Sequence, residues 1–136
     1  MITRLAEYIS DCPYFEGREI KINYLDKEIG SVSLEATGNR KVVRSYADGG
    51  RLISEVFVLA LREAFDMGDF ENICITEKCK GIETWLESKA GDEDFFGEKE
   101  EKALSFLKIL KPFHLVRTEG NFAKYEAEIE TGYLKI

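Results

Sequence analysis

His114 is the only histidine in this chain of 136 residues, and it is the side chain best suited to acid–base chemistry at neutral pH. One imidazole excludes every metal site that needs two histidine ligands. An enzyme could use His114 as a base beside a serine or cysteine brought close by the fold. However, no serine stands in a Gly-x-Ser-x-Gly motif, and His114 lies in an apolar stretch at 113–116. A structural histidine is therefore favoured, and a small enzyme or regulator using His114 is the minor alternative.

The three cysteines, Cys12, Cys74 and Cys79, predict neither a disulfide framework nor a zinc site, because their count is odd and no Cys-x-x-Cys pair occurs. Their number suits a reduced cytosol. On a helix Cys74 and Cys79 would point roughly 140° apart, so both are expected to be thiols that pack a helix. The glycine-rich phosphate motifs are also absent. The sequence thus predicts no catalytic residue, no metal and no cofactor.

The net charge of −7 argues against a protein that clamps DNA or RNA by neutralising phosphates. Six acids lie within 92–101, where Phe95 and Phe96 occupy the middle in place of calcium ligands, so an acidic flexible loop is predicted at about 91–102. The opposite charge collects on a predicted solvated sheet face at Arg40, Lys41, Arg44 and Arg51.

The length fits a single domain at 1–136. Apolar spacing predicts a short helix at 2–11, which Cys12-Pro13 ends. Alternation predicts strands at 19–24, 31–36 and 42–46, the first with Ile20, Ile22 and Tyr24 facing inward. Turns are expected at 26–30, at 37–39 and at 48–50.

The second half contains two ambiguous segments. The run at 52–61 fits a helix or a buried strand, and the preceding Gly-Gly turn favours the strand. The segment 104–110 is also helix or strand, with the closing Pro112 favouring a strand. Between them, the apolar spacing within 71–89 predicts the main helix, with Gly91 as its C-terminal stop. A hairpin is expected at 113–133, with one acidic, exposed face on its second strand.

These elements together predict an α+β domain, a mainly antiparallel β-sheet with two principal helices packed on it. The longest apolar run, 56–61, is far below the ~20 residues of a membrane helix, and no signal peptide opens the chain. We therefore expect a soluble protein that is not exported by a signal of its own, with no membrane partner.

Three segments carry a resemblance to a known family: Arg44-Ser45-Tyr46-Ala47-Asp48-Gly49-Gly50, Val56-Phe57-Val58 and Arg62-Glu63-Ala64-Phe65. Together with the order of the elements, they resemble the phage minor capsid family that groups with siphophage tail terminators. Further parts of the resemblance lie at 5–15, 20–25, 30–35, 82–87 and 123–129, and it extends over residues 2–133 but is poor at 91–102.

The resemblance implies a tail-terminator-like fold with a strand at 52–61, and a structural protein of a phage or prophage with no reaction to catalyse. Such a subunit caps the head-proximal end of the tail tube as a ring, commonly a hexamer. Its partners would be other copies of itself, the major tail tube protein and the head-completion or connector proteins, with DNA only in passage. It would assemble in the bacterial cytoplasm and remain in the virion tail. Another head–tail adaptor or minor capsid protein is the alternative.

The turn at 46–51 is the candidate contact surface under this interpretation. The candidate contact residues within it are Tyr46, Asp48, Gly49, Gly50 and Arg51. Plain hairpin geometry is the simpler explanation of the same residues, because a Gly pair suits a tight turn. The acidic segment at 92–101 is a second candidate surface.

Overall fold

The computed structural model describes residues 2–65, 69–89 and 104–135. The predicted acidic loop at 91–102 lies outside these ranges. The described elements are, in chain order, α1 (Ile2–Ile9), η1 (Pro13–Phe15, a 3-10 turn), β1 (Ile20–Ile22), β2 (Val32–Ser45), β3 (Arg51–Ala64), α2 (Asp69–Lys89), β4 (Leu104–Glu119) and β5 (Phe122–Lys135).

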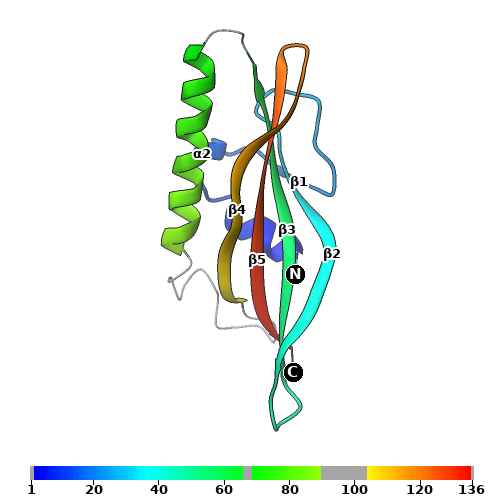
Figure 1. Ribbon diagram of the computed structural model, residues 1–136. Helices are drawn as coiled ribbons and strands as arrows, with labels where there is room; N and C mark the ends of the chain where they lie inside the picture. The colour runs from blue at the N-terminus through cyan, green and yellow to red at the C-terminus, as the bar shows by residue number, and fades with distance from the viewer. Residues whose placement is uncertain (1, 66–68, 90–103, 136) are drawn as a thin grey trace.

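The strands form one sheet with the order β1-β2-β3-β5-β4. β1 pairs with β2 in parallel, whereas the other three pairs are antiparallel, so the sheet is mixed. The four strands after β1 have 14 to 16 residues each, which at ~3.3 Å per residue makes the sheet roughly 45 Å tall. Figure 1 shows these long strands side by side, with α2 running alongside β4.

The fold prediction of two principal helices packed on a mainly antiparallel sheet is wrong. The protein is mainly β, a single mixed five-stranded sheet with one long helix, the 21-residue α2. The other α-helix, α1, has eight residues and ends at Ile9, after which the Asp11 and Cys12 N–H groups donate to the carbonyls three residues back, of Tyr8 and Ile9. The strands are longer than predicted, which shifts the balance further toward β structure.

β2 is the clearest case of a strand that was predicted in two pieces. The expected turn at 37–39 is an irregularity inside one strand, at the register shift between Ala36 and Arg40. Gly38 adopts a φ of 78°, and Thr37 Oγ1 donates a hydrogen bond to the Val56 carbonyl at 2.7 Å. The glycine and hydroxyl chemistry of a turn therefore serves a β-bulge, which lets the strand continue.

The ambiguous segments are both strands. Residues 52–61 lie within β3 and 104–110 within β4, as predicted, and the main helix and the C-terminal hairpin are also confirmed. Pro112 does not close its strand, since β4 continues to Glu119 past a register shift between Lys111 and His114. Tyr24 was expected to face inward but is 55% exposed.

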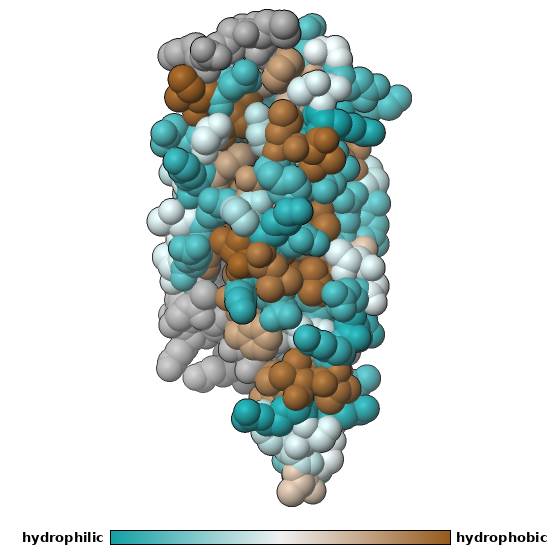
Figure 2. Space-filling model, in the orientation of Figure 1, coloured by the Kyte–Doolittle hydropathy of each residue, from teal (hydrophilic) through white to brown (hydrophobic). Residues whose placement is uncertain are grey.

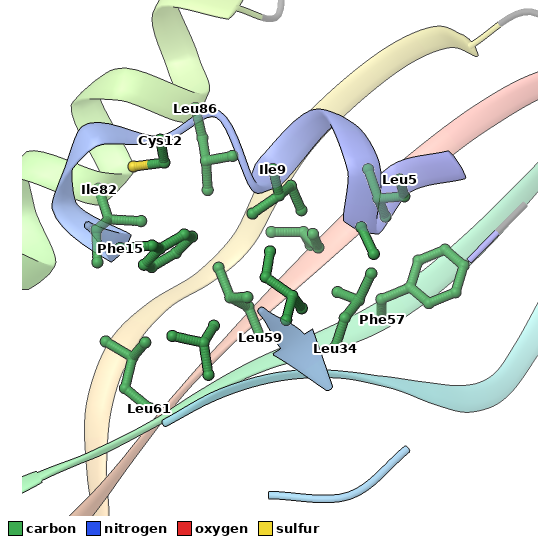
Figure 3. Packing of buried hydrophobic residues seen from close by; sticks show 14 of the residues in the cluster. Leu5, Ile9, Cys12, Phe15, Leu34, Phe57, Leu59, Leu61, Ile82 and Leu86 are labelled. Atoms are coloured by element: carbon green, nitrogen blue, oxygen red, sulfur yellow. The ribbon is translucent and has the colours of Figure 1, made fainter. Parts of the chain in front are cut away.

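Buried side chains fill the space between one face of the sheet and the described helices, as Figure 3 shows. The sheet contributes Leu34, Phe57, Leu59, Leu61 and Ile129, and the helical elements contribute Leu5, Ile9, Phe15, Ile82 and Leu86. No described helix packs on the opposite face of the sheet. On that face the acidic side chains of β5 were predicted to be exposed, but they are half-buried because β5 lies between two other strands. They stand opposite basic residues and the histidine of β4, in the pairs Glu126–His114, Glu128–Lys111 and Glu130–Lys108.

Neither described α-helix combines the length and the apolar character needed to span a membrane.

Candidate functional site

Residues 36–51, which we call the arm, extend the β2–β3 hairpin past the helix-covered part of the sheet. All residues from 36 to 49 are exposed. Figure 1 shows the turn between β2 and β3 projecting beyond the other described elements. The arm is nevertheless held by strand pairing on both sides of its two register shifts, because Lys41 pairs with Ser54, and Arg51 pairs with both Ser45 and Lys135. An ordered backbone therefore holds the arm's side chains away from the body.

The structure brings the five predicted contact residues together at the tip of the arm. The Tyr46 N–H donates to the Gly50 carbonyl at 2.8 Å, and the Gly49 N–H donates to the Tyr46 carbonyl at 3.1 Å. Asp48 Oδ1 accepts from the Gly50 N–H at 2.9 Å, and Gly49 adopts a φ of 92° that few other residues tolerate. Asp48, Gly49 and Gly50 thus form the turn itself, which leaves the exposed Tyr46 and Arg51 side chains available to a partner.

Sequence reasoning missed the apolar residues of the arm. Val42 and Val43 are 50% and 51% exposed, and Tyr46 is 41% exposed. Figure 2 shows hydrophobic surface on this narrow end of the molecule, flanked by hydrophilic residues. The signal was the Val-Val pair itself, because two adjacent residues of a strand point to opposite faces and a strand covered on one face would bury only one of them.

The arm is also the basic part of an acidic chain. Arg40, Lys41, Arg44 and Arg51 face only one acid, Asp48, so the arm carries +3. Because the whole chain has a net charge of −7, the residues outside the arm together carry −10. The prediction of a solvated basic sheet face therefore describes one localised, exposed surface. Arginines and aromatic side chains set among small apolar groups are typical of protein interfaces.

A buried carboxylate anchors the base of the arm. Glu55 has a side chain only 8% exposed, and its Oε2 lies 3.3 Å from Arg40 Nη2. Its other oxygen, Oε1, is buried and has no hydrogen-bond partner among the described residues. Burial raises the pKa of the nearby Tyr133 phenol above its ordinary value; Arg40 lowers it by a smaller effect, and Glu55 adds to the rise. Arg40 is thus both a surface cation of the arm and the counter-ion of a buried acid.

His114 and the cysteines form no catalytic arrangement within the described ranges. His114 Nδ1 lies 3.1 Å from the Pro112 carbonyl oxygen, and no described serine or cysteine forms a hydrogen bond with the ring. Burial raises the pKa of the Cys79 thiol to about 12 and also raises that of Cys12, so both remain protonated at neutral pH. Cys74 is exposed, so the prediction that it packs the helix is wrong. The described residues also include no group of three or more potential metal ligands.

No protein-family model matches this chain, and a search of curated proteins finds no match to its sequence either.

Proposed function

We propose that this protein is a structural subunit of a bacteriophage or prophage tail, a terminator that caps the head-proximal end of the tail tube as an oligomeric ring. The ring, commonly of six copies, would join the tube to head-completion proteins. Two observations support the proposal: the resemblance of residues 2–133 to the minor capsid and tail terminator family, and the form of the arm. The proposal involves no reaction and no cofactor.

The arm is the observation that carries the proposal. In an isolated chain Val42, Val43 and Tyr46 would remain in water on a strand that no described element covers. Such exposed apolar side chains, grouped with cations on one projecting element, are typical of surfaces that bind other proteins. A subunit of an assembly would bury them against its neighbours.

A ring also agrees with the size and charge of the chain. A chain of this length has a radius of gyration of roughly 14 Å, so it can surround a DNA channel only as one segment of a closed ring built from heterologous contacts. The net negative charge favours transient contact with DNA in passage. The cations of the arm would then serve contacts between proteins. Assembly would take place in the host cytoplasm, and the protein would remain in the virion.

The test is the mass and location of the protein in the presence of its proposed partner. We expect sedimentation velocity to show a ring-sized species, formed alone or on addition of assembled tail tubes, and negative-stain electron microscopy to show added density at one end of each tube. A chain that stays monomeric at all concentrations and ignores the tubes would overturn the proposal. Density on the connector and not on the tube would identify another head–tail adaptor. Tight binding of duplex DNA at physiological salt would contradict the idea of DNA in passage.

A further inference from the structure

A shallow groove between α1 and β1 has the properties that a partner of the arm would need. It has a volume of about 230 Å³. Its lining combines the apolar side chains of Ala6, Ile20 and Ile22 with the carboxylates of Glu7 and Glu19. The arm presents the complementary set, valines and a tyrosine among arginines and a lysine. Both the apolar contacts and the charges therefore match.

The carboxylates of the groove differ in how far they are already neutralised. Glu19 forms an ion pair with Lys21, with Glu19 Oε2 at 3.0 Å from Lys21 Nζ. Glu7 is exposed and forms no ion pair with any described residue. Glu7 is thus the acid of the groove best placed to meet a cation from outside.

The arm cannot reach the groove of its own chain. β1 pairs with β2 through Ile22 and Leu34, whereas β2 reaches the tip of the arm eleven residues further along, at Ser45. At ~3.3 Å per residue this separates the groove from the tip by roughly 35 Å. β3 pairs with β5 without interruption over that length, and with β2 on both sides of two register shifts, which prevents the arm from folding back. An occupant with the arm's chemistry must come from another molecule.

We propose that the arm of one subunit binds in the α1–β1 groove of a second copy of this chain. The apolar side chains on one face of the arm lie on the groove floor, and an arm cation such as Arg44 meets Glu7. Donor and acceptor are different surfaces, so the contact is heterologous and each subunit can use both at once. The inference rests on the proposed function and deepens it, because a ring needs such a head-to-tail contact. A small contact of this kind is weak between two subunits, and it is strengthened when the ring closes.

Charge reversal on each side tests the contact. Arg44→Glu changes the arm, and Glu7→Lys changes the groove. We expect each variant alone to raise the dissociation constant for self-association roughly tenfold or more, because like charges then face each other across the contact. The double variant, which restores opposite charges, should recover most of that loss. Arg117→Glu, an exposed cation near the distant end of β4, is the matched control and should associate like the unchanged chain.

Mixing the two single variants gives the sharper result. The Arg44→Glu chain keeps a working groove and the Glu7→Lys chain keeps a working arm. Between unlike chains both contacts then join opposite charges, the unchanged Arg44 with the unchanged Glu7 and the two substituted side chains with each other. An equimolar mixture should therefore form ring-sized species in which the two variants alternate, whereas each variant alone remains monomeric under the same conditions. A symmetric contact in which the arm meets another arm predicts instead that Glu7→Lys alone associates like the unchanged chain. Sedimentation velocity with one variant fluorescently labelled distinguishes these outcomes.

The failure of this contact and the failure of the proposed function give different results. If both variants self-associate or cap tail tubes like the unchanged chain, the arm–groove contact is overturned and the terminator proposal stands. If the unchanged chain neither associates nor binds tubes, both are overturned. Circular dichroism of each variant confirms that the fold is intact, since Arg44 and Glu7 are exposed and lie outside the core.

Discussion

The two ends of the β2–β3 hairpin differ in what covers them. Near β1, Val32, Leu34 and Leu59 are at most 1% exposed and pack under the helices. At the other end of the hairpin, β2 and the turn are exposed from residue 36 to residue 49, although residues 53–57 of β3 remain buried. One ladder of backbone hydrogen bonds joins the two ends, so the difference lies in coverage rather than in the strands themselves. The covered end should therefore determine stability, whereas the arm should determine contacts with partners.

The largest expected effect is at the covered end. Phe57→Ala removes a fully buried ring from the core and should lower the free energy of unfolding by about 3–5 kcal/mol. Tyr46→Ala is the matched control, because it removes an aromatic side chain from the arm of the same hairpin and should change stability by no more than about 0.5 kcal/mol. Urea denaturation followed by circular dichroism measures both. Similar losses in the two variants would show that the ends of the hairpin do not differ in this way.

The next effect is expected beside the base of the arm, in β5. Gly132 is buried, pairs with Ser54 and Phe106, and lies directly against the Phe106 ring, so an added Cβ would collide with that ring. Gly132→Ala should therefore destabilise the fold by about 1–3 kcal/mol. Adding Phe106→Leu should recover part of the loss by making room. If the double variant is no more stable than Gly132→Ala, the contact with the ring is not the cause.

The sequence predicted the covered end much better than the arm, for physical reasons. The run Val56-Phe57-Val58-Leu59 identifies a buried strand because its composition and the preceding turn agree. The bulge at Gly38 was not predictable, since the hydroxyl of Thr37 is satisfied by Val56, nineteen residues away. The Val-Val pair at 42–43 indicates that one of the two side chains is exposed, but the exposure of both depends on where the helices end, which no local pattern contains. The tip was located correctly because Gly-Gly turn chemistry is local.

A smaller effect is expected at the junction of the two regions. Arg40→Gln removes the cation beside the buried Glu55 carboxylate and should destabilise the fold by about 1 kcal/mol. A fully buried pair would lose about 3–5 kcal/mol, but the Arg40 side chain is 61% exposed and water screens it. Adding Glu55→Gln should recover stability, because no buried charge then remains unpaired. Urea midpoints at low and high salt measure this, and an unchanged midpoint for Arg40→Gln would show that Glu55 does not depend on Arg40.

The smallest effect on stability is expected for the apolar residues of the arm. The double substitution Val42→Thr/Val43→Thr keeps the β-branched shape of both side chains, and both are half exposed, so the free energy of unfolding should change by about 0.5 kcal/mol or less. Association should nevertheless weaken, because each substitution replaces a methyl group with a hydroxyl and so reduces the apolar contact with Ala6, Ile20 and Ile22 of the groove. Urea denaturation and sedimentation velocity on the same samples separate the two quantities. A loss of more than about 1 kcal/mol in stability would make the arm part of the folded core, and the contrast between the two ends of the hairpin would then fail.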